Sequence, residues 1–209
     1  MGGRTYAPAG PTLKRFHESD AFVRMLLGPV GSSKSSGSSI EIIRRAREQA
    51  LGPDGKRRTR WAVIRNTFPE LQTTTIKTFR DWLPVGNFRQ SSPPTITLRS
   101  GDIDMEVLFL ALDSEQDANK LLSLELTGAW CNELREIPKA VIDLLTSRVG
   151  RYPAMVDGGP TWFGIIADSN MPDKANRFSK RDDLGLFFGN LLPIQGQSIV
   201  SCNQDNRRR

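Results

Sequence analysis

The residues from Gly28 to Ser35, Gly-Pro-Val-Gly-Ser-Ser-Lys-Ser, have the types and spacing of a loop that binds the phosphates of a nucleotide. In such a loop the backbone N–H groups point at the phosphates, the lysine reaches the β- and γ-phosphates, and the following hydroxyl holds Mg²⁺. ATP or GTP is therefore the first predicted ligand, with Lys34 on the phosphates and Ser35 on the metal. The predicted nucleotide-binding residues are Gly28, Pro29, Val30, Gly31, Ser32, Ser33, Lys34, Ser35 and Ser36.

Ser33 departs from the full motif, which has glycine immediately before the lysine. Its Cβ lies where close approach of the backbone to the phosphates is wanted, so the match is incomplete. A Gly-Ser-Lys-Ser run also occurs in loops that bind no ligand, and its serines can cap a helix instead. The apolar run before the loop and the helical pattern after it favour nucleotide binding.

Hydrolysis of a nucleotide requires a carboxylate that orients or deprotonates water, at the tip of an apolar strand. Two strand ends offer one. They are residues 107–112 followed by Asp113, Ser114 and Glu115, which have the better apolar pattern, and residues 126–131 followed by Asn132 and Glu133. Either carboxylate could also be a capping or solvated residue. The pattern leaves the choice open.

Two further groups of polar residues follow or line predicted strands. Asp102, Asp104 and Glu106 alternate on one strand face and could suggest a metal cluster, although a solvent-facing hairpin edge explains them better. Asp168 is followed by Ser169 and Asn170 at the end of another apolar strand. Such groups can sense a γ-phosphate, or they can form a turn that leads to the next proline.

The hydrophobic pattern predicts the elements that position these groups. Strands are predicted at residues 21–27, 61–65, 95–98, 105–112, 126–131 and 162–167, and helices at 34–50, 69–82, 114–122 and 138–146. This alternation predicts an α/β fold, a mainly parallel sheet covered on both faces, with ligands at the carboxyl ends of the strands. We expect a flexible lead-in at 1–20, one domain at 21–180 and a poorly defined tail at 181–209.

The composition of this chain of 209 residues indicates which classes of partner it could bind. Lys and Arg outnumber Asp and Glu by 29 to 23, and the net charge of +6 is compatible with a polyanion, a membrane surface or an acidic protein. The basic runs at 56–60 and 207–209 are typical of solvated loops or tails. Cys131, Cys202 and the single histidine, His17, form neither a disulfide framework nor a metal-ligand pattern. We expect a soluble, cytoplasmic protein, since neither a membrane span nor a secretory signal is evident.

Several spaced blocks together resemble the large terminase subunit of tailed bacteriophages. They are the phosphate loop, the strand at 61–67 with its Phe-Pro-Glu-Leu continuation, the stretch LTGAWCNELREIP and the run WFGIIADSNMPD. The likeness covers about residues 16–180. It implies a P-loop ATPase of the ASCE (RecA-like) class that drives double-stranded DNA into an empty capsid, with ATP and Mg²⁺ as ligands.

Carried over by position, the resemblance makes Gly28–Ser35 the Walker A loop. It puts Asn132 and Glu133 in the Walker B position, with Glu133 as the catalytic base and Asn132 near the metal, and thus favours Glu133 over Asp113 or Glu115. Ser169 and Asn170 fall in the coupling motif. Asn132 is neutral where many relatives have Asp, which together with Ser33 departs from the family pattern.

The resemblance also sets expectations beyond the nucleotide site. The family carries a C-terminal nuclease domain, for which too few residues follow Asn170, so we expect no nuclease activity from this chain. A transition-state arginine is expected from the same chain or from a neighbour in a ring, with Arg148, Arg151 and Lys120 as candidate cations. Surface ion pairing is the alternative role for each.

The sequence thus predicts an ATP-hydrolysing packaging motor domain. Its expected partners are double-stranded viral DNA, the small terminase subunit, the portal or procapsid, and further copies in a ring. Its expected location is the bacterial host cytoplasm, at the procapsid during packaging, and not the mature virion. The alternatives are a small phosphotransferase such as a nucleotide kinase, and a catalytically weak terminase fragment that acts as a docking module.

Overall fold

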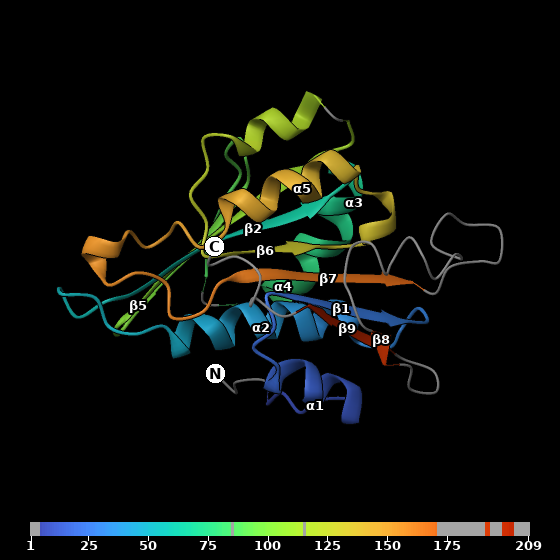
Figure 1. Cartoon of the computed structure of the whole chain (residues 1–209), viewed down its shortest axis with the longest axis horizontal. Helices are drawn as coiled ribbons and strands as arrows, with labels where there is room; N and C mark the ends of the chain where they lie inside the picture. The colour runs from blue at the N-terminus through green and yellow to red at the C-terminus, as the bar shows by residue number, and fades with distance from the viewer. Residues whose placement is uncertain (1–4, 85, 115, 171–190, 193–197, 203–209) are drawn as a thin grey trace.

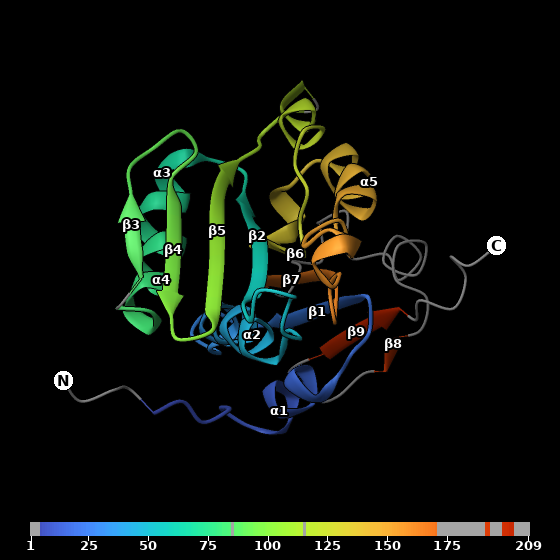
Figure 2. The ribbon, with the colours of Figure 1, turned by 90° about the vertical axis from the view of Figure 1, so that its left-hand side faces the viewer.

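One sheet organises the chain. The computed structural model describes residues 5–84, 86–114, 116–170, 191–192 and 198–202. Its strands form a nine-stranded sheet in the order β3-β4-β5-β2-β6-β7-β1-β9-β8 (Figures 1 and 2). The strands are β1 Val23–Gly28, β2 Arg57–Arg65, β3 Asn87–Arg89, β4 Thr95–Ser100, β5 Ile103–Ala111, β6 Gly128–Cys131, β7 Gly164–Asn170, β8 Leu191–Leu192 and β9 Ser198–Cys202.

The five central strands, β5, β2, β6, β7 and β1, are mutually parallel, and antiparallel strands extend both edges. The described helical segments are α1 Pro11–Glu18, α2 Lys34–Glu48, α3 Phe68–Glu70, α4 Lys77–Trp82 and α5 Lys139–Arg148, the π-helical η1 Leu71–Ile76, and the 3₁₀ turns η2 Gln116–Leu121, η3 Leu134–Glu136 and η4 Met155–Asp157. This arrangement confirms the predicted α/β P-loop fold, with parallel strands alternating with helices.

Two hydrophobic cores fill the space between the sheet and its helices. On one face, α5 and η2 cover the sheet and bury Val141, Leu145 and Leu121 among side chains of the central strands. On the other face, α1, α2 and the helical segment from 68 to 82 bury a second set that includes Ile42 and Phe79. In Figure 1, α5 lies above β6 and β7, and α2 and α1 lie below β7. Residues on both faces of β2 are therefore buried, as the continuous apolar run predicted.

Several local features differ from the prediction. Residues 11–18, expected within a flexible lead-in, form α1, because Leu13 and Phe16 share one helix face and are buried, and Pro11 suits a first helical turn. Strand β2 begins inside the basic run at 56–60, where ion pairs replace the expected solvated loop. The predicted helix at 69–82 has a π-helical middle segment, and the predicted helix at 114–122 is a 3₁₀ turn.

Strands β8 and β9 lie in the tail for which no fold was predicted. Strand β9 pairs antiparallel with β1, from Val23↔Cys202 to Leu27↔Ser198. Within the described part of the chain no helix is long and apolar enough to cross a membrane. The remainder of the tail lies outside the described residues.

Candidate functional site

The phosphate loop connects the carboxyl end of β1 to α2, a helix of 15 residues. The Lys34 side chain is only 8% exposed and points back into the loop. Its Nζ donates hydrogen bonds to the carbonyls of Gly28 at 2.9 Å and Pro29 at 2.8 Å. Backbone N–H groups at a helix N-terminus together with a lysine form a site for anionic groups. The loop thus lies between a strand and a helix, as its sequence predicted, and its binding of phosphates stays a prediction.

Ser33 adopts a left-handed backbone conformation, with φ 62° and ψ 19°. This is the position where the motif has glycine, and a Cβ there is strained. The hydroxyl of Ser33 makes no capping hydrogen bond to α2, so the helix-capping alternative is not supported at this residue. Ser32 bonds within the loop instead, donating to the Pro29 carbonyl at 2.8 Å. The backbone carbonyl of Ser35 accepts a hydrogen bond from the Ser39 hydroxyl at 2.8 Å, and the role of the Ser35 hydroxyl at the metal stays a prediction.

Asn170 connects the predicted base to the predicted phosphate-binding lysine. The parallel register places Asn170 beside Gly28, the first residue of the loop. Its backbone N–H and its side-chain amide donate to the two carboxylate oxygens of Glu133, at 3.2 and 2.9 Å. Its side-chain oxygen accepts a hydrogen bond from Lys34 Nζ at 3.1 Å. One side chain at the end of β7 therefore bridges Glu133 and Lys34.

The order of the strands separates the two carboxylates that the sequence left in competition. Glu133 follows β6, which is separated from β1 by β7 alone. Asp113 follows β5, which lies four positions from β1 in the sheet. At about 4.8 Å per strand, these positions lie roughly 10 and 19 Å from β1. Glu133 is thus the carboxylate beside the loop, and Glu115 lies outside the described residues.

Asn132 is buried, and both its side-chain oxygen and its amide nitrogen bond to protein groups. Its side-chain oxygen accepts hydrogen bonds from Thr75 at 2.7 Å and from Arg65 at 2.9 Å, and its amide nitrogen donates to Asp168 at 2.8 Å. An amide oxygen has two lone pairs, and both are in use. The expected contact of Asn132 with the metal stays a prediction. Asn132 ties the ends of β2, β6 and β7 together.

Asp168 and Arg135 are neighbours of Glu133 that sequence reasoning did not assign to the site. Burial raises the pKa of Asp168 to about 6, although hydrogen bonds from Trp130 and from the Glu133 backbone lower it. Burial lowers the pKa of Lys34, and the charges of Asp168 and Glu133 oppose that shift. Arg135 lies 3.7 Å from Glu133 Oε2 and is the cation that directly pairs with it. The only signal for Arg135 in the sequence was its position two residues after Glu133.

The candidate arginines lie at the ends of the parallel strands that are opposite to the phosphate loop. The backbone N–H of Leu126, just before β6 begins, donates to the carbonyl of Arg148, and its carbonyl accepts from the N–H of Arg151. Both arginines therefore lie near the amino ends of the strands, which contradicts a role for them in their own chain's nucleotide site. Lys120 follows the carboxyl end of β5 in η2 and pairs with Asp117. Action on a neighbouring subunit stays a prediction.

The remaining acidic and thiol candidates have ordinary structural roles. The acidic residues of the β4–β5 hairpin pair with arginines: Asp102 with Arg57, Asp104 with Arg99, and Glu106 with Arg60. These arginines lie on β2 and β4, which flank β5, so β5 is an inner strand and not the expected edge. Across the described residues no group of three His, Cys, Asp or Glu side chains is placed to hold a metal. Cys131 is buried and free, and burial raises the pKa of its thiol.

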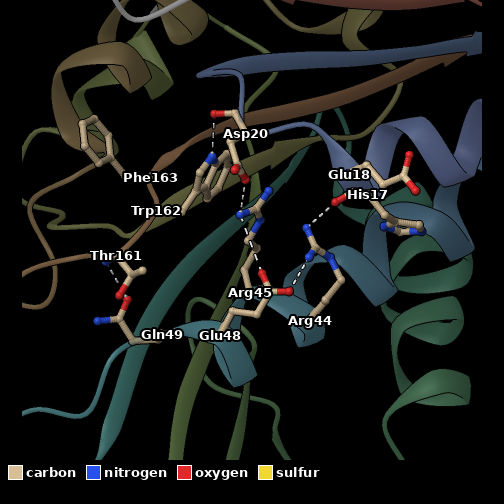
Figure 3. Close-up of a pocket in the computed structure, with 10 residues that line it drawn as sticks. All are labelled: His17, Glu18, Asp20, Arg44, Arg45, Glu48, Gln49, Thr161, Trp162 and Phe163. Carbon is tan, nitrogen blue, oxygen red and sulfur yellow. Dashed lines mark hydrogen bonds and ion pairs between the residues drawn. The ribbon is translucent and has the colours of Figure 1, made fainter.

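A cavity of about 520 Å³ lies at the other end of the molecule, near the amino ends of β1 and β7. Figure 3 shows Arg44, Arg45 and Trp162 among the side chains that line it. Its polar groups already have protein partners: Arg45 pairs with Asp20 at 2.7 Å, and the indole of Trp162 donates to the Asp20 carbonyl at 3.0 Å. This cavity is thus separate from the predicted nucleotide loop, which lies at the carboxyl ends of β1 and β7.

Solved structures of viral packaging proteins are similar to this chain. The large terminase of a thermophilic bacteriophage superposes with a TM-score of 0.57 at 13% identity, over 81% of this chain and 39% of the terminase chain. The complex of that terminase with ATP-γ-S superposes with a TM-score of 0.54 at 11% identity, over 79% and 38%. The N-terminal domain of the DNA packaging ATPase from bacteriophage phi29 gives 0.54 at 13% identity, over 98% of both chains.

No protein-family model and no curated protein sequence matches the chain. The chain spans about 39% of the length of the thermophilic phage terminase, and nearly all of the phi29 N-terminal domain. At identities of 11 to 13%, these likenesses bear on architecture. The chain therefore shares the fold of the N-terminal domain of the phi29 DNA packaging ATPase and of the matching part of the phage large terminase.

Proposed function

We propose that this chain is the ATP-hydrolysing motor domain of a viral DNA-packaging terminase large subunit. The observation that carries the proposal is the bridge through Asn170, which joins Glu133 to Lys34 at the carboxyl edge of the sheet. A phosphate-binding lysine and a carboxylate on a nearby strand are the two groups that hydrolysis of a nucleotide requires. The shared fold, and the ATP-γ-S complex of the thermophilic phage terminase, support ATP as the ligand.

The phosphates of ATP would bind at the backbone N–H groups of the loop, at the start of α2. Lys34 would exchange its bonds to the Gly28 and Pro29 carbonyls for phosphate oxygens. This exchange is favourable because a phosphate oxygen carries more negative charge than a carbonyl. Ser35 would hold Mg²⁺, which when bound neutralises phosphate charge.

Glu133 would accept the proton of the attacking water, and Asn170 would report the state of the phosphates. Asn170 donates two hydrogen bonds to the Glu133 carboxylate, one to each oxygen, so both oxygens are bonded to Asn170. When Lys34 turns to the phosphates, the amide of Asn170 loses one partner and can release Glu133. Ser169, buried beside Leu27 on β1, would carry the change into the sheet.

The proposed motor would act on double-stranded DNA, with the small terminase subunit and the portal or procapsid as partners in the host cytoplasm. We infer that several copies form a ring when active. Arg148 is half-buried and Arg151 is exposed, at the sheet edge away from their own loop. If either acts as the transition-state arginine, it does so in the site of a neighbouring subunit.

The test is the rate of phosphate release from Mg²⁺·ATP by the full chain, alone and with double-stranded DNA and assembled procapsid. We expect turnover that DNA and procapsid increase, and loss of nucleotide affinity on Lys34→Ala. Lys139→Ala, which removes an exposed lysine of α5, is the matched control and should change neither quantity. Binding of Mg²⁺·ATP that is equally tight after Lys34→Ala would contradict the assigned loop.

A second incubation separates the alternatives. With ATP and nucleoside monophosphates, a nucleotide kinase makes nucleoside diphosphate, whereas the proposed hydrolase releases phosphate. Formation of diphosphate from the monophosphate would replace the motor proposal by the phosphotransferase alternative. Tight nucleotide binding with no turnover, even with DNA and procapsid, would favour the docking-module alternative.

A further inference from the structure

A buried carboxylate lies directly beneath the turn that carries Glu133. Asp168 has no exposed surface and lies on β7, paired in register with Leu26 of β1. Its Oδ2 accepts a hydrogen bond from the indole N–H of Trp130 at 2.7 Å. Its Oδ1 accepts two, from the amide of Asn132 at 2.8 Å and from the backbone N–H of Glu133 at 3.3 Å. All three donors are neutral, so this charge is buried without a directly bonded cation, an arrangement that packing alone does not favour.

The turn above Asp168 is strained. Glu133 has φ 54° and ψ 59°, and only Ser33 is a second non-glycine residue with positive φ among the described residues. A residue with a Cβ keeps this conformation when its surroundings hold it there. Two hydrogen bonds hold this backbone: the Glu133 N–H donates to Asp168 at 3.3 Å, and the Glu133 carbonyl accepts from the Glu136 N–H at 2.9 Å. The same conformation turns the Glu133 side chain toward Asn170.

We propose that Asp168 is a positioning residue, which holds Glu133 in its left-handed conformation and so keeps the Glu133 carboxylate facing Asn170 and the phosphate loop. The proposal rests on the proposed role of Glu133 in hydrolysis. A carboxylate suits this task because it accepts from all three donors, whereas an amide at the same position has one accepting oxygen. The neutral Asn132 is its complement, because an amide opposite Asp168 donates where a second carboxylate would repel.

The first test is Asp168→Asn in the full chain. We expect kcat for ATP hydrolysis to fall by about 10²-fold, because the reacting carboxylate is displaced, with KM for ATP changed by less than about threefold. Asp143→Asn, the same substitution on the exposed side of α5, is the control and should leave kcat unchanged. An unchanged kcat after Asp168→Asn would overturn the proposal.

The double variant Asn132→Asp/Asp168→Asn separates the positioning of Glu133 from the stability of the fold. It also provides a test of the proposal if Asp168→Asn alone does not fold. The swap restores a donor and an acceptor between residues 132 and 168, but it turns an amide N–H toward the Glu133 N–H. We expect the thermal midpoint to recover toward the wild-type value while kcat stays low. Recovery of kcat together with the midpoint would mean that Asp168 is a structural residue, and would overturn the proposal.

A third measurement needs no hydrolysis. Glycine adopts φ near 54° without strain, so in a Glu133→Gly background the support from Asp168 is unnecessary. Asp168→Asn should then lower the thermal midpoint by about 3 °C less than it does when Glu133 is present. Equal shifts in the two backgrounds would overturn the proposal even in an active ATPase. Absence of ATP turnover by the wild-type chain would instead contradict the proposed function and leave this result standing.

Discussion

Two buried carboxylates lie at opposite ends of the central strands, and they differ in the groups that bond to them. Glu41, near the amino edge, is fully buried and pairs with Arg24 at 2.7 Å, Arg45 at 2.8 Å and His17 at 2.7 Å. Burial by itself would raise its pKa, but hydrogen bonds from His17 and Arg44 outweigh that effect and hold the pKa well below its usual range. Asp168, at the carboxyl edge, has neutral donors, and burial raises its pKa to about 6.

The difference separates the part of the molecule that secures the fold from the part proposed to do chemistry. The Glu41 cluster joins α1, α2 and β1, and its carboxylate is paired with cations. The carboxyl edge contains an undercompensated Asp168 and the two strained residues Ser33 and Glu133. Strain and perturbed carboxylates concentrate at functional sites, where they cost stability. We therefore expect substitutions at the carboxyl edge to change rates, and those in the Glu41 cluster to change stability.

The largest effect is expected for Glu133→Gln. Removing the general base should lower the rate of ATP hydrolysis by about 10² to 10⁴-fold, with nucleotide affinity retained because Lys34 and the loop are untouched. Phosphate release and nucleotide titration measure the two quantities separately. Glu125→Gln, at an exposed position before β6, provides the matched control. If Glu133→Gln hydrolysed ATP at the wild-type rate, a different residue would be the base.

The second-largest effect is expected for Glu41→Gln, which should lower stability without changing the rate of hydrolysis. Removing the carboxylate leaves buried arginines uncompensated and should cost about 3 to 5 kcal/mol in free energy of unfolding. Denaturant unfolding measures this loss. Glu48→Gln, at a half-exposed position that pairs with Arg44 and Arg45, should cost less than about 1 kcal/mol. Equal losses for the two variants would remove the contrast between the edges.

The pH dependence of stability should differ between the two carboxylates. The raised pKa of Asp168 means that the folded chain binds its proton more tightly, so its destabilising effect at pH 7 disappears as the pH falls through about 6. The wild-type chain should thus gain up to about 3 kcal/mol relative to Asp168→Asn between pH 7 and pH 4. The lowered pKa of Glu41 contributes stability that is present above its ordinary value of 4.5 and is lost as the pH falls below it.

Thermal unfolding of wild type, Asp168→Asn and Glu41→Gln between pH 7 and pH 4 measures both trends. The midpoint difference between wild type and Asp168→Asn should move in favour of wild type as the pH falls. The difference between wild type and Glu41→Gln should shrink once the pH passes below about 4.5. A constant difference for Asp168→Asn across this range would contradict the assigned pKa.

The smallest effect is expected for Ser33→Gly, which should stabilise the chain. Ser33 has φ 62°, and glycine relieves the clash of its Cβ, a gain of about 1 kcal/mol. The gain is limited because glycine also increases the entropy of the unfolded chain. Thermal unfolding measures it, with Ser36→Gly inside α2 as a control that should destabilise by a similar amount. A lower midpoint for Ser33→Gly would mean that the Ser33 side chain stabilises the loop.

Local pattern predicted much of the fold and less of the site. Continuous apolar runs located β1, β2, β5 and β7, because parallel strands are buried on both faces. Helix α1 was missed because the glycines and prolines around it obscured the buried pair Leu13 and Phe16. The local pattern left Glu133 and Asp113 in competition, because strand order is set by tertiary packing and not by either strand end.

The resemblance to terminases favoured Glu133, and the position of β6 in the sheet agrees with that choice. It also suggested Asn132 as a metal ligand, which stays a prediction, and it gave no sign of the hydrogen bonds that the Asn132 oxygen accepts from Thr75 and Arg65. Asp168 was visible as a strand-end residue only. Its contacts with Trp130 and Asn132 depend on the register of β6 against β7, which no local pattern reveals.

The most direct test of the central claim is a structure of the full chain determined with Mg²⁺ and ATP-γ-S. We predict that the triphosphate lies on the loop from Gly28 to Ser35, that Lys34 Nζ contacts its phosphate oxygens, and that the Glu133 carboxylate faces the terminal phosphate. Nucleotide bound elsewhere, or Lys34 still bonded to the Gly28 and Pro29 carbonyls beside a bound nucleotide, would contradict the account.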